Sequence, residues 1–85
     1  MYVEGRVQGV FFRESSRNTA DRLGVTGWIR NLPDGGVDAV VEGEEDRVQQ
    51  MISYLSVGPS RAVVDNVRVI EEEPMGDFIG FSVVR

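Results

Sequence analysis

The run from Gly5 to Arg13, GRVQGVFFR, contains residue types that together could bind a tetrahedral oxyanion. Its two glycines allow a tight loop in which successive backbone N–H groups point at one place. The run lies just before a segment with helical periodicity, so a helix N-terminus would face the same place. Arg13 stands at that point, and its guanidinium can donate two parallel hydrogen bonds to phosphate oxygens. The run predicts phosphate binding, but it does not tell whether a bond to phosphate is broken.

Each of these residues also has a purely structural interpretation. The glycines suit any tight turn from a strand to a helix, and from the loop alone both interpretations are equally good. Arg13 could equally be an ordinary surface arginine with no ligand. Asn31 lies two residues before Pro33, where asparagine is typical of a turn. Its side-chain amide could also orient a water molecule without titrating. Trp28 is expected in the core rather than at a ligand site.

The chain lacks the side chains that most often act as general bases, nucleophiles and metal ligands. It contains no histidine and no cysteine, which removes the commonest base and all thiolate chemistry. Ser15 and Ser16 have no histidine or lysine to activate them, so a serine nucleophile is not expected. The run Glu71-Glu72-Glu73 is expected to be a solvated loop, with a weak cation site as an open alternative.

Composition predicts one small acidic domain. The 85 residues are 41% hydrophobic and 27% charged, which suffices for a single core spanning residues 1–85. The formal net charge of −5 disfavours nucleic-acid binding, which uses a basic surface. No apolar run is long enough for a membrane helix, and no secretory signal opens the chain. We therefore expect a cytoplasmic protein with no membrane partner. The oligomeric state is open, with a monomer as the default expectation.

The elements that would position the run follow from periodicity and turn residues. One helix is predicted over 12–23 with Gly24 as its cap, and a second follows the acidic residues 44–46. The second helix would bury one stripe made of Val48, Met51, Ile52 and Leu55. Strands are predicted over 2–7, 26–30, 37–42, 62–71 and 78–85, with turns over 31–36 and 71–77. The last strand would present Ile79, Phe81 and Val83 on one face.

The order of these elements is strand, helix, strand, strand, helix, strand, strand. This order predicts an α+β fold, a ferredoxin-like split βαβ sandwich with a short C-terminal strand. An antiparallel sheet would carry both helices on one face. Only seven residues precede Gln8, so the first strand, which positions the loop, is expected to be short.

Two motifs give the chain a resemblance to the acylphosphatase family. Residues 5–13 resemble the phosphate-binding loop of that family, and GVTGWIRN at 24–31 resembles its second motif. Asp34-Gly35, the segment 37–43, Gly58-Pro59 and the segment 78–85 also resemble family members. A glycine-rich loop alone is a weak signal, but two motifs at the right separation in a fitting order of elements are a strong one.

The resemblance implies hydrolysis of a small acyl phosphate to a carboxylate and inorganic phosphate, without metal or cofactor. It implies that Arg13 binds the phosphoryl group and that Asn31 holds the attacking water. The backbone groups that would wrap the phosphate oxygens are the N–H groups of Gln8, Gly9, Val10, Phe11 and Phe12. Such chemistry suits these residues, because phosphoryl transfer has a loose transition state in which positioning and charge stabilisation dominate.

Two other functions stand as alternatives. The first is a non-catalytic phosphate or carbamoyl phosphate-binding module, similar to the acylphosphatase-like domain of hydrogenase-maturation proteins. The short, cysteine-free chain favours the standalone enzyme over this module. The second is a nucleic-acid or regulatory binding domain with the same order of elements. The acidic charge and the lack of an aromatic RNA-binding strand argue against it.

Overall fold

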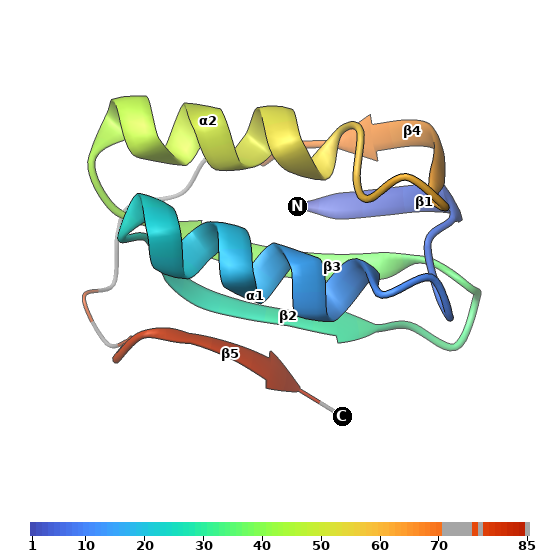
Figure 1. Cartoon of the computed structure of the whole chain (residues 1–85), viewed down its shortest axis with the longest axis horizontal. Helices are drawn as coiled ribbons and strands as arrows, with labels where there is room; N and C mark the ends of the chain where they lie inside the picture. Colours follow the sequence, from blue (N-terminus) through green and yellow to red (C-terminus); the bar gives the residue numbers. More distant parts are fainter. Residues whose placement is uncertain (71–75, 77, 85) are drawn as a thin grey trace.

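The structure is a computed structural model that describes residues 1–70, 76 and 78–84. Its elements are β1 (Tyr2–Arg6), α1 (Phe12–Leu23), β2 (Thr26–Asn31), β3 (Val37–Glu42), α2 (Glu45–Leu55), β4 (Val63–Arg68) and β5 (Phe81–Val84). Both helices lie on the same side of the sheet (Figure 1). The predicted order, the α+β class and the single helical layer are confirmed. Neither of the helices in these described ranges is long and apolar enough to cross a membrane.

The strands form one mixed sheet in the order β4-β1-β3-β2-β5. In this order each strand from β4 to β2 is antiparallel to its neighbour, as predicted. Strand β5, however, runs parallel to β2, with Phe81 paired to Gly27. The prediction of a wholly antiparallel sheet is therefore wrong at this edge. The physical reason is topological: β4 ends at the end of the sheet where β2 begins, so a strand that starts there runs along β2 in the same direction.

The hydrophobic core fills the space between the helices and the sheet. Its largest fully buried apolar side chains are Phe12, Ile29, Met51, Leu55, Val3, Val7 and Val37. On α1 the buried residues are Phe12, Ser16, Thr19 and Ala20. On α2 the predicted stripe is buried at Met51 and Leu55, but Val48 and Ile52 are only half-buried. Ile52 lies on the flank of the stripe, about 100° around the helix from Met51.

Strand β4 is shorter than the predicted 62–71. Its last residue, Arg68, pairs with Tyr2, which is the first residue of β1. Val69 and Ile70 therefore have no strand beside them and are exposed. The predicted solvated run Glu71-Glu72-Glu73 lies outside the described residues.

Strand β5 is also shorter than the predicted 78–85. Gly80 has a φ of 72°, which is outside the extended region, so the strand begins only at Phe81. Phe81 is buried and Val83 is half-buried, as expected. Ile79 was predicted to face inward with them, but its side chain is 98% exposed because it precedes the strand.

Trp28 was predicted to lie in the core, but it lies on the sheet face that the helices leave open. Neighbouring residues of a strand point to opposite faces. Ile29 is buried beneath the helices, so Trp28 and Arg30 point away from them. Trp28 is half-buried, and the guanidinium carbon of Arg30 lies 5.1 Å from the centre of its ring.

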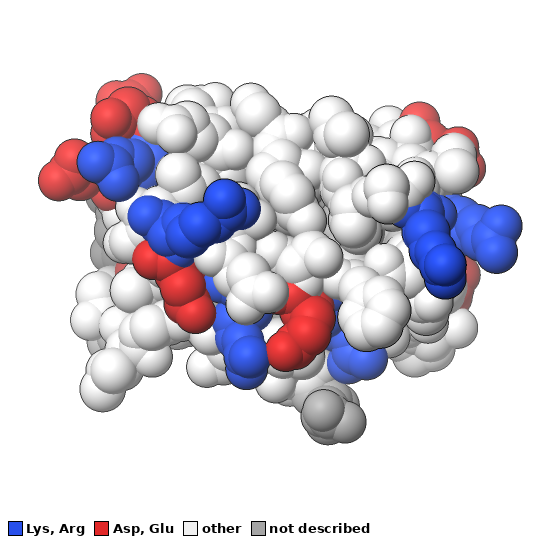
Figure 2. Space-filling view, viewed as in Figure 1, with Lys and Arg blue, Asp and Glu red and all other residues white. Residues whose placement is uncertain are grey.

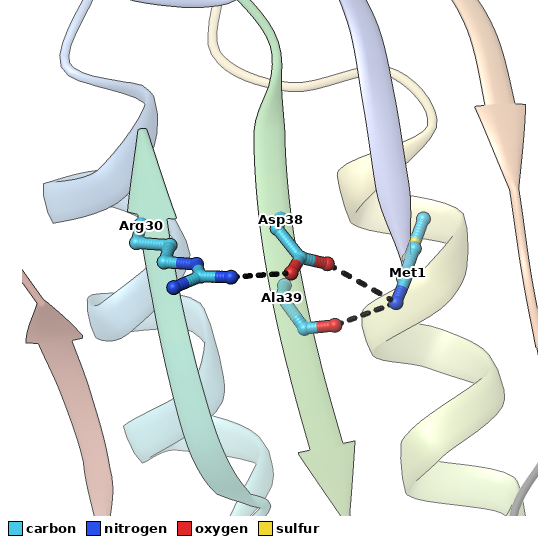
Figure 3. A network of polar contacts seen from close by, with 4 residues as sticks. All are labelled: Met1, Arg30, Asp38 and Ala39. Atoms are coloured by element: carbon cyan, nitrogen blue, oxygen red, sulfur yellow. Dashed lines mark hydrogen bonds and ion pairs between the residues drawn. The ribbon is translucent and has the colours of Figure 1, made fainter. Parts of the chain in front are cut away.

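A polar network on this open face connects β2 and β3 to Met1, the residue before β1 (Figure 3). The carboxylate of Asp38 lies 3.6 Å from the Arg30 guanidinium and 3.8 Å from the Met1 amine. The same amine donates a hydrogen bond of 2.6 Å to the Ala39 carbonyl oxygen. Arg30 is thus engaged at the middle of the sheet and does not line the cleft described below.

Candidate active site

A cleft of about 440 Å³ opens where the N-terminus of α1 meets the ends of β2 and β5. Its lining residues are Val7, Gly9, Phe11, Phe12, Arg13, Glu14, Asn31 and Val83. Arg13 is the second residue of α1, and Asn31 is the last residue of β2. The fold therefore brings to one cleft the two side chains that the sequence motifs singled out.

The loop between β1 and α1 turns sharply at two residues in the left-handed region. Gly9 has a φ of 72° and Phe11 a φ of 60°, the latter being the one non-glycine residue with positive φ in the described part of the chain. Val10, between them, is buried in the core. The carbonyl oxygen of Phe11 accepts the first helical hydrogen bond, from the Ser15 N–H at 3.0 Å. In the part of the chain that the structure describes, no side-chain hydrogen bond caps this end of α1.

The backbone N–H groups of this loop have no acceptors within the described part of the protein. Among the described residues, none of the N–H groups of residues 8–12 donates a hydrogen bond to another protein group. The first turn of α1 adds further free N–H groups and the positive end of the helix dipole. Consecutive free N–H groups beside a helix N-terminus are an arrangement that binds anions.

The guanidinium of Arg13 is free to bind a ligand. Over residues 1–70, 76 and 78–84, no carboxylate lies within ion-pair distance of it. Glu14, the carboxylate in the cleft lining, is bound instead to Arg17 at 3.0 Å. Figure 2 shows basic side chains at the end of the molecule where Figure 1 places the β1–α1 loop. An anion entering the cleft would therefore meet an uncompensated positive charge.

Asn31 carries a buried polar atom that has no partner among residues 1–70, 76 and 78–84. Its Oδ1 is shielded from solvent and accepts no hydrogen bond from any described residue. An unpaired buried oxygen is unfavourable by about 1–3 kcal/mol, so a bound donor such as a water molecule would relieve this cost. Asn31 was predicted to begin the turn, but it pairs with Val37 as the last residue of β2, so the strand fixes its backbone.

Gln8 connects the loop to the turn that follows Asn31. Its Nε2 donates hydrogen bonds to the carbonyl oxygens of Leu32, at 2.7 Å, and Gly36, at 2.9 Å. The Gln8 side chain does not line the cleft. Sequence reasoning assigned only the backbone N–H of Gln8 and missed this side-chain role, because backbone carbonyl partners leave no signal in the sequence.

Tyr2 and Asp34 hold the same turn. The Tyr2 hydroxyl donates to Oδ2 of Asp34 at 2.6 Å, and Oδ1 of Asp34 accepts the Gly36 N–H at 2.9 Å. The hydrogen bond to Asp34 raises the pKa of Tyr2 to about 12. The bonds from Tyr2 and from the Gly36 N–H lower the pKa of Asp34. A Cβ at residue 36 would lie 2.8 Å from the Tyr2 ring, so a larger residue there would displace the ring.

The fold and the cleft define a class of small ferredoxin-like α+β domains in which a strand-to-helix loop presents free N–H groups beside an arginine. Comparisons with known proteins show the family of the chain. The family model described as Acylphosphatase matches residues 1–83. The chain is 54% identical over 83 residues to a Rubrobacter xylanophilus protein named acylphosphatase, covering 98% of this chain and 76% of that protein.

Solved structures agree with this result. The crystal structure of acylphosphatase from Bacillus subtilis has a TM-score of 0.94 and 33% identity, covering 99% of this chain and 93% of that one. HypF from T. kodakarensis has a TM-score of 0.84 and 32% identity, covering 99% of this chain but 11% of HypF. The chain belongs to the acylphosphatase family, a family of enzymes that hydrolyse acyl phosphates. The resemblance read from the two motifs is confirmed.

Proposed function

We propose that this chain hydrolyses acyl phosphates in the cleft at the start of α1, with no metal ion. The N–H groups of residues 8–12 and the Arg13 guanidinium bind the phosphoryl group, and Asn31 orients the attacking water. One observation supports this assignment above all. Among the described residues, Arg13 with its unpaired guanidinium, Asn31 with its unpaired Oδ1 and three residues with free N–H groups, Gly9, Phe11 and Phe12, line one cleft, whereas Gln8 and Val10 do not line it.

Phosphoryl binding in this proposal is electrostatic. The charge of the transition state is spread over three equatorial oxygens, and donors already in place stabilise it without rearrangement. Arg13 supplies a planar pair of donors, while the loop and the first turn of α1 supply N–H groups. Local positive charge therefore acts on the substrate although the whole chain has a net charge of −5.

Water attack requires little more than orientation. Oδ1 of Asn31 accepts one hydrogen bond from the water, which directs an oxygen lone pair at phosphorus. The bond from water oxygen to phosphorus forms as the bond from phosphorus to the acyl oxygen breaks, and the water proton passes to a phosphoryl oxygen. The products are a carboxylate and inorganic phosphate. A carboxylate is a good leaving group and the transition state is loose, so neither histidine nor a metal is needed.

Two further parts of the proposal concern the state of the protein. Within the described residues no group of three acidic side chains is placed to hold a metal ion, and the charge stabilisation is assigned to Arg13 and the loop. All the proposed site residues come from one chain, so a monomer suffices for activity. The cytoplasmic location remains a prediction.

Hydrolysis of benzoyl phosphate by the wild type, Arg13→Ala and Arg13→Lys tests the proposal. We expect wild-type turnover, and a loss of about 10³-fold or more in Arg13→Ala, as for other arginines that stabilise phosphoryl-transfer transition states. Arg13→Lys should recover part of the rate, since it keeps the charge but not the planar pair of donors. The melting temperature should change little, because Arg13 has no ion pair in the described part of the chain.

Two results would contradict this proposal. An Arg13→Ala variant with the wild-type rate would remove Arg13 from the reaction. The wild type is assayed with and without EDTA, and activity that appears only without EDTA would refute the metal-free mechanism.

A non-catalytic phosphate-binding module is the second candidate. It is supported by the likeness to HypF, a much longer protein of which this chain covers 11%. The two candidates separate in one comparison. A module would bind inorganic phosphate in calorimetry and leave benzoyl phosphate intact.

A further inference from the structure

The cleft is larger than a phosphoryl group requires. Its volume of about 440 Å³ falls within the range of sites that enclose whole small molecules. In the proposed mechanism the phosphoryl group and the water occupy the part beside Arg13 and Asn31. The rest of the lining includes the apolar side chains of Phe11 and Val83. The acyl half of the substrate would lie against this apolar part.

Phe11 is the lining residue that folding explains least. Its side chain is 75% exposed, while Val10 and Phe12 beside it are almost fully buried. Its backbone is also left-handed, with a φ of 60°, a conformation that is unfavourable for a residue with a Cβ. An aromatic ring that stays in water and carries backbone strain adds little to stability. Contact with a ligand would remove the ring from water and account for its position.

The charges around the cleft indicate what kind of acyl group would fit. Arg13 is the cation in the lining and is assigned to the phosphoryl group. Glu14 is the anion in the lining, and Arg17 already neutralises it at 3.0 Å. Among the described residues of this lining, a second negative charge on the acyl group would find no free cation, and it would be desolvated against apolar side chains. An uncharged apolar acyl group meets neither penalty.

We propose that Phe11 and Val83 form an acyl subsite that favours substrates with an apolar, and above all an aromatic, acyl group. This inference rests on the proposed function. Phe11 comes from the β1–α1 loop and Val83 from β5, so two separate elements bring apolar surface to the cleft. An aryl group can stack or pack edge-to-face on the Phe11 ring. An acetyl group offers too little surface to use it.

The test is the ratio of kcat/KM for benzoyl phosphate to kcat/KM for acetyl phosphate. We expect this ratio to fall about tenfold in Phe11→Ala, in keeping with the loss of one apolar contact in a binding pocket. Phe11→Leu should give an intermediate ratio, and Val83→Ala should shift the ratio in the same direction. Ile79→Ala is the matched control, because Ile79 is 98% exposed and does not line the cleft. It should keep the wild-type ratio.

Phe11→Gly separates the ring from the backbone. Glycine adopts a φ of 60° without strain, so the ratio in Phe11→Gly should fall as in Phe11→Ala if the ring makes the contact. Equal losses on both substrates in Phe11→Ala, or a wild-type ratio in Phe11→Gly, would overturn the subsite while the proposed function stands. A wild type that hydrolyses neither substrate would overturn the proposed function, and the subsite with it.

Discussion

The position of Asn31 in the structure differs from the one that its local sequence predicts. A polar residue shortly before Pro33 is typical of a turn, where its amide would bond to its own backbone or to water. In the structure it ends β2, and pairing with Val37 holds its backbone in the ladder. The side chain is then turned inward, with a buried Oδ1 that has no acceptor role within the described protein. Such an atom suits the binding of a small donor.

We expect Asn31→Ala to lower kcat by about 10²–10³-fold, the loss typical of removing one transition-state hydrogen-bond group. KM should change much less, because the water is held for the transition state rather than for substrate binding. Stability should fall little, since the substitution removes an oxygen that is unpaired among the described residues. Steady-state kinetics with benzoyl phosphate and a thermal melt measure both effects. Unchanged kcat in Asn31→Ala would exclude the proposed water site.

The proposed site is assembled from two connections, the β1–α1 loop and the β2–β3 turn. Gln8 joins them, because its amide donates to the Leu32 and Gly36 carbonyl oxygens at 2.7 and 2.9 Å. Tyr2 adds a second contact, a hydrogen bond from β1 to Asp34 in the β2–β3 turn. These contacts set where Asn31 lies relative to the loop. Gln8 is therefore a positioning residue in the proposed mechanism.

Gln8→Leu should uncouple the two connections without unfolding the protein. The Leu32 and Gly36 carbonyl oxygens keep other donors, the N–H groups of Gly35 at 3.2 Å and of Leu32 at 2.9 Å. The free energy of unfolding should therefore drop by only about 1–2 kcal/mol. We expect kcat to fall, because the water and the phosphoryl group are no longer held in register. Urea unfolding and kinetics on the same sample measure the two effects.

Gln8→Glu serves as the size-matched control. Its carboxylate would face two carbonyl oxygens and repel them, so it should destabilise the protein more than leucine does. A Gln8→Leu variant with wild-type kcat would show that the hydrogen bonds do not position Asn31.

The stability of the whole molecule should depend on pH through the Tyr2–Asp34 pair. The lowered pKa of Asp34 makes a contribution that is present above the ordinary value of 3.8 and is lost as the pH falls below it. The raised pKa of Tyr2 makes a contribution that is present below 10.0 and is lost as the pH rises toward about 12. The pair therefore stabilises the fold between these limits.

The melting temperatures of the wild type and Tyr2→Phe measure this contribution. Phenylalanine keeps the ring against Gly36 and removes only the hydroxyl. We expect a constant difference between about pH 5 and about pH 9, within the ordinary pKa values of Asp and Tyr. The difference should shrink as the pH falls below 3.8 and Asp34 becomes protonated. A difference that persists in strong acid would show that the pair does not stabilise through the ionised carboxylate.

Local patterns were sufficient for much of this protein. The bounds of α1 agree with the prediction at both ends, from Phe12 to Leu23, with Gly24 as the cap. The bounds of β3, from Val37 to Glu42, agree as well. Helix periodicity, strand alternation and glycine turns depend on residues close in the chain, so they can be read without the fold. The two motifs likewise identified the family.

Contacts between distant segments decided the rest. The parallel direction of β5, the exposure of Ile79 and the open-face position of Trp28 depend on which strands become neighbours. The Gln8 link depends on carbonyl groups more than twenty residues away. The exposed ring of Phe11 depends on a loop that buries both of its neighbours. Local sequence shows which groups could meet in a site, but long-range packing sets their directions and distances.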